Sequence, residues 1–240
     1  MRKSRIAALL LLATAVLAQQ QQTVEITSEP SHHLVFQNEF VRVFDVTIPP
    51  KTSSLVHRHN YDYLFVTLGD SDVLSVRPGE KPAQLLLKDG DVRFTPGNFA
   101  HAAINQIDRP FHNITIELLK PSSEVSGCGG DGCTGPLPCS SDKPGRCPTI
   151  TRLIASDQWT VSLIKMPPSS RLEKHTHSMP HLVVAVSDLN LSQQTASAAS
   201  AIKSVTGDVA WVPAGVTHTI TNLDTKPAQY VALEFKTESK

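Results

Sequence analysis

The chain has 240 residues, of which 22 are basic and 22 acidic, and only 18% of its residues are charged. This balance excludes a strong electrostatic field that would attract nucleic acid or an anionic membrane surface. The length is sufficient for one or two domains, each with its own core. Short alternating runs of valine, threonine and leucine occur between 17 prolines, without helical periodicity after residue 22. The composition therefore predicts an all-β protein.

The first 18 residues have the three parts of a secretory signal peptide. Three of the first five residues are basic, residues 6–17 form an apolar core, and residues 16–18 (Val-Leu-Ala) form a cleavage site. The apolar core is too short to anchor the mature chain across a bilayer. We therefore expect residues 1–18 to be removed and the mature chain to be exported, either to a periplasm or out of the cell. An uncleaved N-terminal anchor is the alternative.

A series of short strands is predicted over residues 31–120. The run from Phe40 to Ile48 alternates apolar and polar residues until two prolines end it, and Gly and Pro signals separate the later runs. The predicted strands cover residues 40–48, 63–68, 84–87, 92–95 and 113–119.

The same order of features returns from about residue 149. His57 and His175 are 118 residues apart, and His101 and His218 are 117 residues apart. Paired prolines precede the first member of each set at equal distance, and a glutamate follows the last member after sixteen residues. Agreement at so many landmarks predicts an internal duplication. The predicted strands of the second half cover residues 160–166, 182–186 and 230–236.

The second half contains a dense group of histidines. His175, His177 and His181 fall within seven residues of a sequence typical of a β-strand, and His218 follows in a later segment. Successive side chains on a strand point to opposite faces, so His175 and His177 point the same way. With His218 on a neighbouring strand, three or four imidazole nitrogens would form a metal site. One such pair is a weak signal, but its repetition in the first half raises it above chance.

These spacings resemble the two motifs of the cupin superfamily, and the chain resembles a bicupin. The second motif, Gly-x5-Pro-x-Gly-x2-His-x3-Asn, is complete in the second half, and Asn98 replaces its second glycine in the first half. The first motif, Gly-x5-His-x-His-x3,4-Glu-x6-Gly, is less faithful, because Lys51 and Ser169 replace its opening glycine and Asp188 its closing one. The resemblance implies one jelly-roll β-barrel for residues 31–120 and another for residues 149–240, with the ligands pointing inward.

The resemblance also implies a metal site in the second barrel. His181 occupies the position of the family's acidic ligand, which gives a set of four neutral imidazoles. The implied cofactor is a divalent transition metal: iron, manganese, nickel, copper or zinc. Because binding requires neutral imidazole, the affinity is expected to fall as the pH drops through about 6.5. The predicted ligands are His175, His177, His181 and His218.

The acidic ligand of the first barrel is ambiguous in the sequence. Counted back from Gly69 it is Asp62, whereas counted forward from His59 it is Tyr63. A carboxylate is the preferred ligand of the two, and metal binding is expected to be weaker than in the second barrel. Because cupins without metal are well represented in the family, loss of the metal from either barrel is the alternative. The predicted ligands are His57, His59, Asp62 and His101.

Residues 121–148 join the two halves, contain all four cysteines and are rich in Gly, Ser and Pro. A structureless connection of this length is unusual unless it is cross-linked. In an exported protein we expect disulfides, and the pairing of Cys128 with Cys133 and of Cys139 with Cys147 needs the fewest assumptions. A four-thiolate zinc site is the alternative, but the cysteines lack the close pairs that are usual in such sites.

The sequence leaves three functions open. The first is an oxygen-using or related metalloenzyme, since similar cupins include dioxygenases and isomerases. Tyr61, Tyr63 and Glu234 are candidates for the lining of its barrels. The second is a non-catalytic protein that binds or senses a metal or small ligand, and the third is a structural bicupin. The first two predict a small-molecule partner and no nucleic acid, and a homo-oligomer is left open. Residues 189–204 are expected to form a loop.

Overall fold

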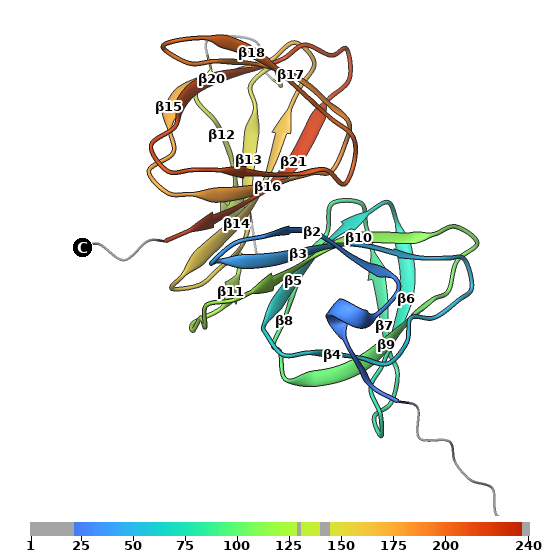
Figure 1. Cartoon of the computed structure of the whole chain (residues 1–240). Coiled ribbons are helices and arrows are strands. Elements are labelled where there is room, and N and C mark those ends of the chain that lie inside the picture. The colour runs from blue at the N-terminus through green and yellow to red at the C-terminus, as the bar shows by residue number, and fades with distance from the viewer. Residues whose placement is uncertain (1–21, 129–130, 140–144, 237–240) are drawn as a thin grey trace, which may run out of the picture.

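The computed structural model describes residues 22–128, 131–139 and 145–236. The expected signal peptide, residues 1–18, and the last residues of the second predicted domain, 237–240, lie outside this part of the chain. The described residues are organised as two β-barrels that pack against each other (Figure 1). No helix in the described ranges is long and apolar enough to cross a membrane. The predicted all-β fold with two jelly-roll barrels is therefore confirmed.

The first barrel is made of two five-stranded sheets, and the 3-10 helix η1 (Ile26–Ser28) lies between two of its early strands. One sheet has the order β1 (Val24–Glu25), β4 (His57–His59), β9 (Phe99–Asn105), β6 (Ser71–Val76) and β7 (Ala83–Leu87). The other has the order β2 (His32–Gln37), β3 (Val41–Ile48), β10 (Phe111–Leu118), β5 (Tyr63–Leu68) and β8 (Val92–Thr95).

The second barrel repeats this plan with a seven-stranded and a four-stranded sheet. The larger sheet has the order β11 (Ser126–Gly127), β13 (Thr149–Ala155), β14 (Trp159–Met166), β21 (Ala228–Phe235), β16 (His181–Ala185) and β19 (Val209–Val212), with β12 (Thr134–Pro136) also paired to β13. The smaller sheet has the order β15 (Arg171–Thr176), β20 (Thr217–Asn222), β17 (Leu189–Gln194) and β18 (Ala199–Ser204).

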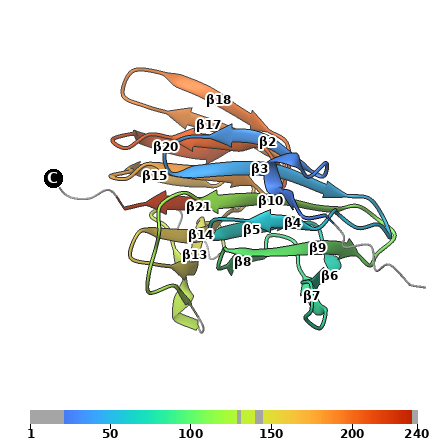
Figure 2. The same cartoon turned by 60° about the horizontal axis from the view of Figure 1, so that its bottom comes forward.

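Strand alternation explains why the barrels have both an inner and an outer core. On β3, Phe44 and Val46 point into the first barrel, whereas Val43 points out toward the second. At the junction, Ile116 of β10 and Leu233 of β21 belong to one continuous apolar cluster, and the two strands lie near each other in both views (Figures 1 and 2). The barrels are therefore joined by a dry apolar interface.

Three departures from the family glycines keep the glycine backbone conformation. Lys51 and Ser169, which replace the opening glycine of the first motif, both have φ of 56°. Asn98, which replaces the second glycine of the second motif, has φ of 62°. The left-handed region is unfavourable for residues with a Cβ, so these turns are held by the surrounding strands rather than by the local sequence. The backbone conformation of the motif is therefore retained at positions where the glycine has been replaced.

The connecting segment carries both expected disulfides, Cys128–Cys133 and Cys139–Cys147. The expectation of a segment without strands is wrong, because β11 and β12 pair with β13 at the edge of the second barrel. Their side chains are mostly exposed, which removes the apolar alternation that reveals a strand in sequence.

Two further boundaries differ from the expectations. The first barrel begins before residue 31, because Val24 pairs with His57 and Ile26 is 1% exposed in the barrel core. Residues 189–204 form the hairpin of β17 and β18 instead of a loop. Leu189 and Leu191 point inward there. The Ser, Ala and Gln residues around them have low strand propensity, so the local composition does not predict these strands.

Candidate metal centres

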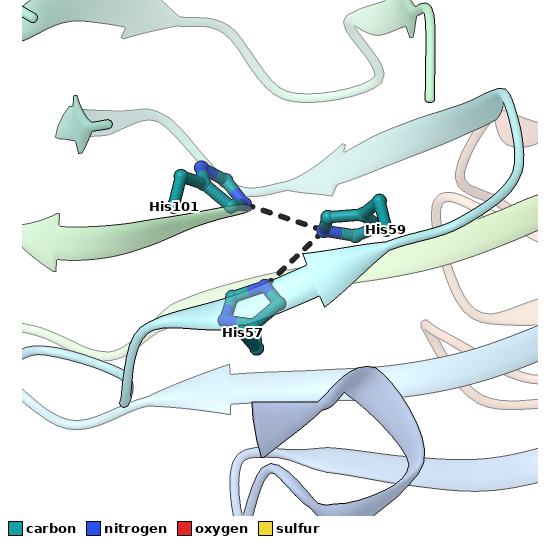
Figure 3. Close-up of side chains that lie close together, drawn as sticks. All are labelled: His57, His59 and His101. Atoms are coloured by element: carbon teal, nitrogen blue, oxygen red, sulfur yellow. Dashed lines mark hydrogen bonds between the residues drawn. The ribbon is translucent and has the colours of Figure 1, made fainter. Parts of the chain in front are cut away.

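The first barrel brings His57, His59 and His101 together (Figure 3). His57 and His59 lie two residues apart on β4 and point inward, and β9 places His101 directly opposite His57. The Nε2 atom of His59 lies 3.1 Å from that of His57 and 3.3 Å from that of His101. All three residues are at least 91% buried. Three of the four predicted ligands of this barrel therefore meet.

The hydrogen bond of the His57 ring directs its Nε2 lone pair toward this meeting point. His57 Nδ1 lies 3.0 Å from the carbonyl oxygen of Leu55, which can only accept, so Nδ1 carries the proton of the neutral ring. His101 Nδ1 lies 2.9 Å from Ser75 Oγ. A ring that is fixed in this way through its other nitrogen is the usual arrangement for a metal-ligating histidine.

Burial keeps these imidazoles neutral. It lowers the pKa of His57 to about 4 and that of His101 to about 3, and neighbouring rings add to the effect. The pKa of His59 is lowered further by burial and by the two rings beside it. Neutral imidazole is the form that ligates a metal, so the first barrel presents its ligands ready for binding at neutral pH.

The second barrel contains an equivalent triad of His175, His177 and His218. The β15–β20 register places His175 opposite His218. Each pair of Nε2 atoms is 3.1 Å apart. His175 Nδ1 donates to the carbonyl oxygen of Glu173 at 2.8 Å, so its Nε2 also presents a lone pair. His218 is 7% exposed, whereas the other two are only half-buried, so this site is the more open one.

Both triads have the dimensions of a metal site. Nitrogen ligands at about 2.0–2.1 Å from one ion, with angles between octahedral and tetrahedral, lie about 2.8–3.4 Å apart. The observed separations of 3.1–3.3 Å fall in this range. Each donor set of three imidazoles therefore fits a divalent transition metal.

Asp62 does not join the first triad. Its Oδ1 accepts a hydrogen bond from the amide of Gly97 at 2.8 Å. Gly97 packs so closely here that an added Cβ would lie 2.4 Å from the carbonyl carbon of Tyr61. The Asp62 carboxylate thus holds the segment of Gly97 close to the segment of Tyr61 and Asp62. Tyr61 is 41% exposed and does not contribute to the cavity lining.

Tyr63 occupies the fourth position of the first barrel, as the forward count from His59 indicates. It pairs with Glu117 across β10, as His181 pairs with Glu234 in the second barrel. Its ring stacks on His59 with the centroids 4.0 Å apart. Burial raises the pKa of Tyr63 to about 12, so it stays a neutral phenol. The inward position therefore holds a phenol instead of a carboxylate.

His181 lies beside the second triad but belongs to a different group. Its ring centroid is 4.1 Å from that of His177, and it forms a separate potential ligand set with His177 and Glu234. Glu234 Oε1 lies 3.7 Å from His177 Nδ1, and this contact is the main cause that lowers the pKa of Glu234. The expected centre had four imidazoles. The structure instead brings three imidazoles together, and the Glu234 carboxylate lies behind His177, one of these three ligands.

Each triad opens into a cavity of its own barrel. The first cavity has a volume of about 250 Å³ and the second about 320 Å³. In the second, Ile150, Leu191 and Ile220 are part of a largely apolar lining. In the first, Ser75, Arg77 and other polar residues contribute, and the Arg77 guanidinium lies 3.8 Å above the Phe99 ring. The two barrels therefore offer different environments to a ligand.

A buried pair that the sequence motifs do not include lies beside the first triad. His32 Nδ1 lies 2.6 Å from Glu29 Oε2, and the two residues are 9% and 3% exposed. Burial alone would raise the pKa of Glu29, but hydrogen bonds from His32 and from two backbone amides lower it. One signal was available in the sequence, because His32 has no counterpart in the second half.

The comparisons with solved structures point to one fold. AerE from Microcystis aeruginosa matches 87% of this chain and 99% of its own, with 12% identity and a TM-score of 0.59. Oxalate decarboxylase from Bacillus subtilis matches 82% of this chain and 68% of its own, with 14% identity and a TM-score of 0.55. A cupin 2 conserved barrel domain protein from Leptotrichia buccalis matches 85% of this chain and 88% of its own, with 11% identity and a TM-score of 0.53.

At these identities the likeness shows the fold alone, and function depends on the site. No protein-family model and no curated protein sequence matches the chain. The duplicated strand order and the equivalent registers show that the two halves share this fold. The chain therefore has the cupin fold twice in tandem, with a histidine triad that fits a metal ion in each barrel.

Proposed function

We propose that the protein is a metal-dependent enzyme that converts a small molecule in at least one of its two barrels. The observation that carries this proposal is the convergence of three imidazole Nε2 atoms in the lining of a cavity. Three protein ligands leave coordination positions free, as in catalytic metal sites. A bound divalent ion would supply Lewis acidity to a ligand oxygen in the cavity.

The chain's own residues shape what such a site accepts. The second cavity has room for a molecule with an apolar body, and its polar lining includes the triad and Glu234. The Glu234 carboxylate lies 3.7 Å from His177 Nδ1 and places a negative charge beside this ligand.

The metal is the first thing to test. Metal-free protein would be reconstituted separately with manganese, iron, nickel, copper and zinc, and metal content would be measured by elemental analysis. Manganese comes first because a solved neighbour, the Bacillus subtilis oxalate decarboxylase, is described with Mn(II) centres. Each loaded form would then be incubated with a library of small carboxylic acids and phenols, with conversion followed by mass spectrometry and dioxygen by electrode. Retention of metal without conversion of any compound would favour the non-catalytic binding or sensing protein.

Export is part of the same proposal. Two disulfides in the connecting segment suit an oxidising compartment outside the cytosol. Intact-mass analysis of protein from its native host is expected to show a mature chain that begins at Gln19. A dominant species that retains residues 1–18 would contradict cleavage and export.

A further inference from the structure

His32 and Glu29 form a rigid unit beside the first triad. The Glu29 carboxylate accepts hydrogen bonds from the Ser31 amide at 2.8 Å, from the Leu55 amide at 3.0 Å and from His32 at 2.6 Å. A carboxylate that receives this many N–H groups acts only as an acceptor, so Nδ1 of His32 is the donor. In the neutral ring, Nε2 of His32 is then a hydrogen-bond acceptor.

The His32 ring lies beside the metal ligands in the lining of the first cavity. Its centroid is 4.6 Å from that of His57 and 6.4 Å from that of His59, and the ring is part of the cavity lining. No hydrogen bond joins its Nε2 to another residue in the described part of the chain. A polar atom at this place is therefore available to a molecule bound next to the triad.

The fold itself does not require a histidine here. His32 pairs with Val46, and the equivalent pair in the second barrel is Ile150 with Ile164. Ile150 fills the same inward position as part of an apolar cavity lining. A buried polar pair is seldom more stabilising than well-packed apolar residues of similar volume. The His32–Glu29 pair is thus a specific addition to the first barrel.

We propose that His32 is a substrate-contacting residue of the first barrel, whose Nε2 accepts a hydrogen bond from a hydroxyl of a small hydroxylated organic anion. Glu29 acts as its positioning residue by fixing the ring and its tautomer. Arg77, which lies on the Phe99 ring in the same cavity lining, supplies the positive charge for the anionic group. This assignment rests on the proposed function, since the anion is expected to bind beside a metal held by the triad.

The test uses the full chain with His177→Ala, loaded with zinc, so that metal binding is confined to the first barrel. Glycolate and acetate serve as probes, because they differ in one hydroxyl, and their affinities are measured by calorimetry. His32→Asn keeps an N–H donor for Glu29 and removes the acceptor at Nε2. We expect this variant to lose about threefold to tenfold of the preference for glycolate, the range for one hydrogen bond, with little change toward acetate.

Two further variants separate this contact from a general effect on folding. His32→Gln carries an amide oxygen near the position of Nε2 and should restore part of the glycolate preference. His112→Asn, which alters a half-exposed pair with Asp45 outside the cavity lining, should leave it unchanged. Full retention of the preference in His32→Asn, or no glycolate binding by zinc-loaded protein, would overturn the assignment. Absence of zinc in the first barrel, measured by elemental analysis, would overturn the metal site of this barrel together with the assignment and would leave the proposed function to the second barrel.

Discussion

Replacement of His59 by alanine is expected to remove the metal from the first barrel and leave the second loaded. Its Nε2 lies at 3.1 Å and 3.3 Å from the other two ligand atoms, so its loss leaves only two donors. Loss of an outer partner of a ligand already costs roughly 10–100-fold in metal affinity, and loss of a ligand should cost more. His177→Ala should have the reciprocal effect. Elemental analysis after reconstitution and dialysis measures both.

Two controls make this result specific to the triads. His33→Ala removes an exposed histidine that belongs to neither ligand set, and it should keep all metal. His181→Ala should lose less metal than His177→Ala, because His181 lies outside the three-imidazole group. Equal and complete loss of metal in His181→Ala would show that the second centre uses four imidazoles. Full metal content in His59→Ala would contradict a metal site at the first triad.

Metal-free protein is expected to lose stability steadily as the pH falls from about 6.5 toward about 4. Burial lowers the pKa of His57 from 6.5 to about 4, so between these values the unfolded chain binds a proton that the folded chain does not. Stability therefore rises with pH across this window and is lost as the pH falls. The depression corresponds to about 3 kcal/mol at the acidic end.

Urea unfolding of metal-free protein at a series of pH values measures this dependence. His57→Gln, which removes the titrating ring, should show a smaller loss between pH 6.5 and 4 than the wild type. For the same reason the first barrel should hold its metal well below pH 6.5, in contrast to the expectation for unperturbed histidines. An unfolding free energy that is independent of pH in this window would contradict neutral burial of the triad.

The sequence by itself determined the two triads and the disulfides. Histidines two residues apart share a strand face whatever surrounds them, because alternation is a local property of the backbone. The agreement of two half-chains then identified His101 and His218 as the partners. The cysteines were also within reach of local reasoning, since the shortest loops join Cys128 to Cys133 and Cys139 to Cys147.

Only the tertiary structure decided between Asp62 and Tyr63 and brought His32 to the site. Which of two adjacent residues points inward depends on the cross-strand register of β5 with β10, and a shift of one residue exchanges the two faces. His32 reaches the triad because β2 pairs with β3 and η1 places Glu29 beneath it. These are long-range pairings, and the local sequence contains neither the register nor the partner that fixes it.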